Sequence, residues 1–123
     1  MRYLTDRKRA VGMGASKTGT QHHWFMQVSS VALIFLVPLF VFTFGPILGG
    51  TYEEIVAYYS RPLPAVIAAL TMVVGMMHFK NGCQMALEDY VHGLTGRLLV
   101  IFVTCLSYAI AAVSVFALVR IAL

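Results

Sequence analysis

Charged side chains are scarce in this sequence. Lysine, arginine, aspartate and glutamate make up 11% of the 123 residues, whereas soluble globular domains average about 25%. Only five residues are acidic. This composition excludes an ordinary soluble enzyme domain, and the length leaves room for a single domain, residues 1–123.

Catalytic and nucleotide-binding motifs are also missing. The sequence has no glycine-rich dinucleotide loop, no P-loop and no CxxC pair. Its two cysteines, Cys83 and Cys105, fall in apolar stretches, where they are most simply small packing residues. We therefore expect no complete catalytic site in this chain alone.

The sequence has instead three long apolar runs. An α-helix needs roughly 20 apolar residues to cross a bilayer, and it satisfies its backbone hydrogen bonds internally, as lipid requires. We therefore predict an all-α membrane protein with three transmembrane helices. The spans are expected at about residues 28–48, 63–88 and 98–120.

Basic residues gather before the first run. Five of the nine lysines and arginines lie there, against a single acidic residue: Arg2, Arg7, Lys8, Arg9 and Lys17. Cytoplasmic flanks of membrane spans carry such an excess, which predicts an N-terminus in the cytoplasm or on the matrix side; binding of nucleic acid is the less favoured alternative. We expect residues 1–27 to form this arm and the start of the span, largely irregular before residue 22.

Two further features concern local structure. Pro38 lies inside the first run and is expected to kink the helix. The connection to the second run contains a segment, Glu53 to Tyr59, that is expected to form a short helix in the membrane interface, with tyrosines as anchors.

One histidine, His78, lies well inside the second run. An ionisable side chain within a span is costly and therefore suggests a functional site. At roughly 100° per residue, Met85 and Asp89 fall within about 20° of His78, and Gly82 and Gly75 within about 60°. Glycines on this face either leave room for a flat group or let a neighbouring helix approach closely. The pattern alone leaves both explanations open.

An Asp-Tyr pair, Asp89 and Tyr90, ends the second run at the membrane surface. The step from His78 to Asp89 is roughly 16 Å along a helix. An imidazole at depth suits an axial haem ligand, and a phenol beside a carboxylate suits hydrogen bonding to a quinone. The structural alternatives are a histidine bonded to a neighbouring helix, an interfacial tyrosine and a helix-end carboxylate.

The segment from His78 to His92, HFKNGCQMALEDYVH, resembles the signature of the hydrophobic membrane-anchor subunit of succinate dehydrogenase (respiratory complex II). It is most like the alphaproteobacterial and mitochondrial versions. The basic arm, the His-His-Trp sequence before the first span, the three spans and the total length extend the resemblance over nearly the whole chain.

The resemblance implies a set of partners and cofactors. The chain would be half of a heterodimeric anchor bundle with a second membrane-anchor subunit, and the bundle would hold the iron–sulfur and flavoprotein subunits on the cytoplasmic or matrix face. A haem b would lie between the anchors, with His78 as one axial ligand to the iron. Ubiquinone would be reduced beside Tyr90, with Asp89 in support. The chain would thus serve succinate:ubiquinone oxidoreduction without forming the catalytic core, in a bacterial inner membrane or the mitochondrial inner membrane.

One position departs from the family pattern. Many relatives carry an arginine near the start of the first span, on the side of the haem propionates, where this chain reads Gln27. His22, His23 and Ser30 are candidates for replacing it.

Two other functions compete with this interpretation. One is the anchor of a quinol:fumarate reductase, working in the opposite direction. The other is a small three-helix transport or assembly protein with His78 and Lys80 lining a polar path. A transporter should show substrate-binding groups in more than one span, and the first and third spans offer only hydroxyls and Gln27.

Overall fold

The computed structural model describes residues 4–12 and 19–122. Three helices dominate these ranges: α2 (Gly19–Phe44), α4 (Pro62–Tyr90) and α5 (Gly93–Ala122). Each is long and apolar enough to cross a membrane. No strand occurs in the described ranges, so the predicted all-α fold with three membrane-spanning helices is confirmed.

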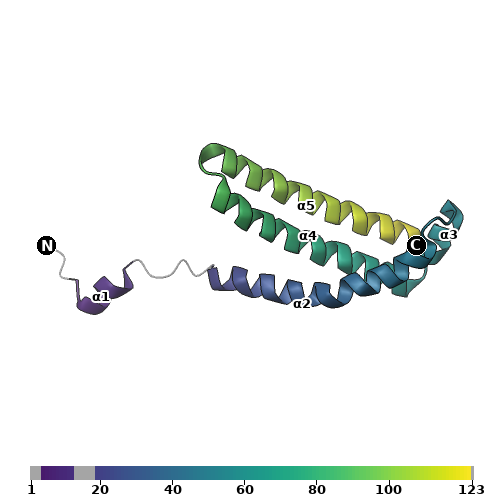
Figure 1. The fold of residues 1–123 in the computed structure, drawn as a ribbon, viewed down its shortest axis with the longest axis horizontal. Helices are drawn as coiled ribbons and strands as arrows, with labels where there is room; N and C mark the ends of the chain where they lie inside the picture. Colours follow the sequence, from purple (N-terminus) through teal and green to yellow (C-terminus); the bar gives the residue numbers. More distant parts are fainter. Residues whose placement is uncertain (1–3, 13–18, 123) are drawn as a thin grey trace.

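The central helix of the bundle is α4. Figure 1 shows α4 between α2 and α5, and it packs on both of them, whereas the described residues of α2 and α5 do not pack on each other. Small residues dominate the buried positions of the three long helices, among them Ser29, Ala65, Ala68, Gly96 and Ser107. Membrane helices associate through such small residues because lipid gives them no hydrophobic driving force.

The helix α2 and the helix α4 run in opposite directions. Thr71 of α4 donates to the Leu36 carbonyl oxygen of α2 at 3.4 Å. Further along, a Cβ atom added at Gly82 would lie 3.9 Å from the Met26 side chain. The beginning of α2 therefore lies beside the end of α4, so both belong to the same end of the bundle.

A short helix, α3 (Tyr52–Tyr59), lies at the opposite end, after a 3-10 turn, η1 (Gly45–Ile47). A capping box starts α3: Thr51 N–H donates to Glu54 Oε2 at 2.8 Å, and Glu54 N–H donates to Thr51 Oγ1 at 3.3 Å. Tyr59 is buried, and burial, followed by the neighbouring Tyr58, raises the pKa of its phenol. The predicted short helix is confirmed and begins at Tyr52.

A tight turn joins α4 to α5. Gly93 has φ of 76°, which favours glycine. At Gly96 a Cβ atom would collide with the Val91 carbonyl oxygen, so the helix start can pass this close to the turn only without a side chain. Only Val91 and His92 separate the two helices.

The arm before the first span is more regular than the sequence predicts. A helix, α1, covers Asp6–Val11, and Thr5 caps it by accepting a hydrogen bond from Lys8 N–H at 3.3 Å. Asp6 in its first turn suits the positive end of the helix dipole. The expected irregularity is thus wrong for these residues; residues 1–3 and 13–18 lie outside the described ranges. The helix α2 continues through Pro38 and bends along its length (Figure 1).

Candidate functional site

A hydrogen bond between side chains joins α2 to α4 at His78. Ser29 Oγ lies 2.9 Å from His78 Nδ1, and the two residues are 49 positions apart in the chain. Ser29 is 5% exposed, whereas His78 is only partly buried. The imidazole is therefore held from one side by α2.

The second ring nitrogen of His78, Nε2, has no hydrogen-bond partner in the described part of the chain. Within residues 4–12 and 19–122, the one hydrogen bond of the imidazole is at Nδ1. The only buried side-chain nitrogen or oxygen without a partner in these ranges is Nε2 of His22, not of His78. Nε2 of His78 is accordingly both accessible and uncommitted.

The backbone carbonyl of Met26 completes this local arrangement. Ser29 Oγ lies 3.1 Å from it and Ser30 Oγ 2.8 Å from it. Both serines therefore bond one turn back along α2, but only Ser29 also reaches α4. The hydroxyl of Ser29 thus lies between an imidazole nitrogen and a carbonyl oxygen.

The glycines on the His78 face of α4 are not needed to let α2 approach closely. A Cβ atom at Gly82 would make an ordinary contact of 3.9 Å with Met26, and one at Gly75 would meet nothing within 4 Å. Neither glycine is required by the packing of the described chain. This favours the explanation that the face leaves room for something else.

The Asp-Tyr pair forms the last two residues of α4. Tyr90 is 85% exposed and Asp89 is also exposed. Twelve residues of helix place Tyr90 about 18 Å from His78 along the axis. The two candidate residues therefore share one helix but lie at different depths.

A small cavity of about 230 Å³ lies under the turn beside this pair. Neither Asp89 nor Tyr90 lines it; its walls come from the end of α4, the turn and the start of α5: Glu88, Val91, Gly93, Gly96, Arg97 and Val100. Glu88 accepts a hydrogen bond from Gln84 at 2.8 Å. The cavity does not bring the predicted site residues together.

Lys80 faces α5. Its Nζ lies 5.6 Å from the centroid of the Tyr108 ring, which is cation–π geometry. The cation is thus directed to the other neighbour of α4 and not to the Ser29–His78 pair. The polar path that would combine His78 and Lys80 is not formed by the described part of this chain.

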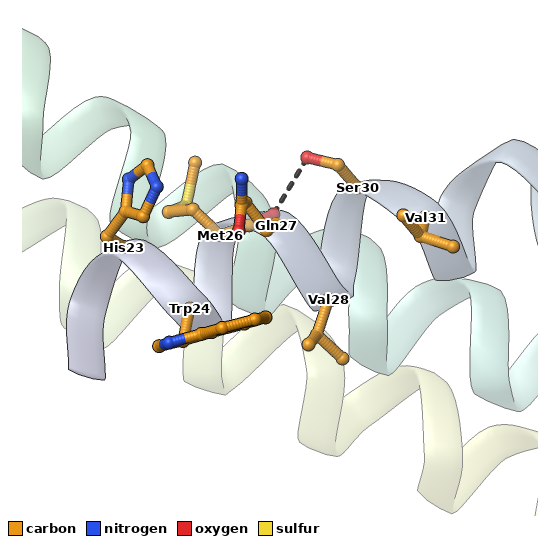
Figure 2. Close-up of a pocket in the computed structure, with 7 residues that line it drawn as sticks. All are labelled: His23, Trp24, Met26, Gln27, Val28, Ser30 and Val31. Atoms are coloured by element: carbon orange, nitrogen blue, oxygen red, sulfur yellow. Dashed lines mark hydrogen bonds between the residues drawn. The ribbon is translucent and has the colours of Figure 1, made fainter. Parts of the chain in front are cut away.

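A hollow of about 630 Å³ lies on α2 alone. Figure 2 shows His23, Gln27 and Ser30 on one side of the helix and Trp24 on the other. His78 does not line this hollow, and neither does His22. Three residues were considered as replacements for the arginine that many relatives carry at this position. Of these, only His23 and Ser30 line the same hollow as Gln27.

The sequence did not identify Ser29. Its signal was a pair of serines, Ser29-Ser30, inside an apolar run, and nothing in that pair indicates which member faces α4. The described residues contain no group of three or more histidines, cysteines, aspartates or glutamates that could hold a metal ion. Both cysteines are free.

Comparison with protein families gives a match over almost the whole chain. Residues 1–119 match the family described as succinate dehydrogenase/fumarate reductase transmembrane subunit.

Individual relatives agree with this match. The chain is 45% identical over 123 residues to the succinate dehydrogenase hydrophobic membrane anchor subunit of Paracoccus denitrificans, which covers 100% of this chain and 95% of that protein. It is 23% identical over 90 residues to the succinate dehydrogenase membrane anchor subunit of Reclinomonas americana, covering 71% of this chain and 75% of that protein. No solved structure matches the chain.

Proposed function

Because the chain belongs to the succinate dehydrogenase/fumarate reductase transmembrane subunit family, we propose that His78 is an axial ligand of a haem b and that Tyr90 and Asp89 form part of a ubiquinone-reduction site. The family and the full-length relative establish its role as a membrane-anchor subunit of succinate dehydrogenase. The three apolar helices are those of an integral membrane protein. A transport or assembly function has no support from these relatives.

The observation that supports haem ligation is the state of the His78 imidazole. One ring nitrogen is bonded to Ser29 at 2.9 Å, and the other has no partner in the described residues. A histidine that ligates haem iron uses one nitrogen for the metal and the other for a hydrogen bond. Gly75, which has nothing within 4 Å of its would-be Cβ, leaves this face open one turn away. These residues fit a haem that a second membrane-anchor protein of the complex would help to hold.

A haem b bound there would supply a one-electron redox centre. This chain would contribute the neutral imidazole of His78, held at a fixed depth by α2. Apolar side chains around it would exclude water and help to set the redox potential.

The exposure of Tyr90 supports the quinone site. Reduction of a quinone to the quinol takes up two electrons and two protons, and negative charge develops on the carbonyl oxygens. The Tyr90 hydroxyl can donate a hydrogen bond to one of these oxygens. Asp89, adjacent to it at the end of α4, can support proton delivery at the membrane surface.

The arrangement of the helix ends supports a location for the soluble partners. The beginning of α2 and the end of α4 lie at the same end of the bundle, and basic residues precede α2. By the positive-inside rule this end faces the cytoplasm of a bacterium, or the matrix of a mitochondrion. We place the iron–sulfur and flavoprotein subunits there, where their electrons reach a quinone beside Tyr90.

A reduced-minus-oxidised optical spectrum of the purified complex tests the haem assignment. We expect a b-type band in the wild type, its loss in His78→Ala, and its retention in His92→Ala, which removes an exposed histidine from the turn. An unchanged band in His78→Ala would show that another residue holds the haem.

A further inference from the structure

We infer that Ser29 is a positioning residue for His78, and this inference rests on the proposed role of His78 as a haem ligand. The hydroxyl of Ser29 accepts the Nδ1 proton of the imidazole and donates its own proton to the Met26 carbonyl. The Nε2 lone pair is then free for the iron.

The position of the proton on the imidazole decides which ring nitrogen can bind iron. A neutral imidazole carries one N–H, so a histidine that binds iron through Nε2 must carry its proton on Nδ1. Inside a span this N–H needs an acceptor from the protein, because lipid offers none. Ser29 Oγ, at 2.9 Å, is the acceptor that the described chain provides.

The proton of the Ser29 hydroxyl also needs an acceptor. Once Ser29 Oγ accepts from His78, its own O–H must point elsewhere, and the Met26 carbonyl oxygen lies 3.1 Å away. That carbonyl also accepts from Ser30 at 2.8 Å, so the turn of α2 from Met26 to Ser30 is tied together by both hydroxyls. The alternative arrangement, in which Ser29 donates to Nδ1, would put the proton on Nε2 and block ligation.

Ser29 is an uncharged hydrogen-bond partner for His78. The nearest carboxylate on α4 belongs to Glu88, ten residues or about 15 Å along the helix. The hydrogen-bond partner of the ligand is therefore a hydroxyl and not a carboxylate. A hydroxyl is a weak acceptor, so the proton stays on Nδ1 and the ligand stays a neutral imidazole. The ferrous state is therefore not disfavoured, as it would be with an imidazolate ligand.

The experiment uses the complete purified complex carrying Ser29→Ala, Ser29→Thr, Thr71→Val or His78→Ala. Thr71→Val is the matched control, because the Thr71 hydroxyl also reaches from α4 to α2, at 3.4 Å from the Leu36 carbonyl, but does not touch His78. Assembly yield is measured first. The readouts are haem per complex, the midpoint potential and the g values of the low-spin ferric haem, which report the orientation of the ligand ring.

We expect Ser29→Ala to weaken haem retention about 10- to 100-fold, as is typical when the hydrogen-bond partner of a metal-ligating histidine is lost. The remaining haem should show a higher midpoint potential and altered g values. Ser29→Thr, which keeps the hydroxyl, should restore all three, and Thr71→Val should change none of them.

Two results would contradict the inference, and they differ from a failure of the proposed function. If His78→Ala abolishes the haem while Ser29→Ala leaves content, potential and g values unchanged, Ser29 does not position the ligand. If Ser29→Ala and Thr71→Val have equal effects, the serine only packs the helices. If the haem survives His78→Ala, the ligand assignment itself is wrong, and the role of Ser29 falls with it.

Discussion

Ser29 on α2 and His78 on α4 are 49 residues apart in the chain, and their side chains approach to 2.9 Å. Ser29 is almost completely buried, and its hydroxyl is bonded on both sides, to the imidazole and to the Met26 carbonyl. A rotation of α2 about its own axis would carry the serine away from the ring. The orientation of the imidazole is therefore coupled to the packing of two helices.

Loss of the Tyr90 hydroxyl should impair quinone reduction selectively. In Tyr90→Phe we expect a roughly 2- to 10-fold fall in succinate:ubiquinone activity, since one hydrogen bond contributes about 0.5–1.5 kcal/mol. Electron transfer from succinate to an artificial dye acceptor should not change. Tyr52→Phe is the control, because Tyr52 is 80% exposed, like Tyr90 at 85%, but lies at the other end of the bundle. An equal loss of both activities in Tyr90→Phe would argue against a quinone role.

Lys80 and Tyr108 should be energetically coupled. Their geometry, with 5.6 Å between Nζ and the ring centroid, predicts a coupling free energy of about 0.5–2 kcal/mol within the membrane. A double-mutant cycle with Lys80→Met and Tyr108→Leu, followed by thermal unfolding of the complex, measures it. Haem content should stay at the wild-type level in all three variants, because this pair faces away from His78. Additive effects of the two substitutions would show that no cation–π interaction stabilises the complex.

A side chain at Gly96 should destabilise the α4–α5 hairpin. The Cβ atom of Gly96→Ala would collide with the backbone oxygen of Val91, which cannot turn aside as a flexible side chain can. We expect a loss of about 1–3 kcal/mol, outweighing the helix preference for alanine over glycine of about 1 kcal/mol. The yield and melting temperature of the assembled complex measure it. Gly19→Ala, at a glycine of α2 with open space around it and away from His78, should preserve both; similar losses at the two sites would refute the steric explanation.

The capping box of α3 should stabilise the connection between α2 and α4 without affecting electron transfer. Thr51→Ala removes the acceptor of the Glu54 N–H and is expected to cost about 0.5–2 kcal/mol locally. Amide hydrogen exchange should become faster in α3 and stay unchanged in α4 near His78. Ser114→Ala is a suitable control, because that hydroxyl only bonds back to the Ile110 carbonyl of its own helix. Unchanged exchange in α3 would mean that its packing on α4 and α5 holds it without the cap.

The sequence predicts well those features that depend on one segment at a time. Three apolar runs of sufficient length predicted three membrane helices, and the helical spacing from His78 to Tyr90 follows from α4 being continuous. The sequence also predicts the short helix before α4, because a segment with several tyrosines suits the membrane interface. In each case the information is local, so no knowledge of neighbouring helices was needed.

Features that depend on how two helices face each other were not predictable. The choice of Ser29 over Ser30 as the partner of His78 depends on the rotation of α2, and α2 is apolar on nearly every side, so its pattern does not define an inner face. The role of Gly96 is equally hidden, because it depends on where the Val91 carbonyl comes to lie. The helix at Asp6–Val11 is likewise not indicated by the sequence, because the segment is short, polar and basic and is followed directly by Gly12.

The two-residue connection between α4 and α5 also constrains how the protein enters a membrane. Val91 and His92 are too few to cross a bilayer, so the two helices must insert together as a hairpin. The polar residues near its bend, including Asp89 and Arg97, then come to one and the same side of the membrane. Insertion as a hairpin therefore fixes Tyr90 on the same side of the membrane as the start of α5.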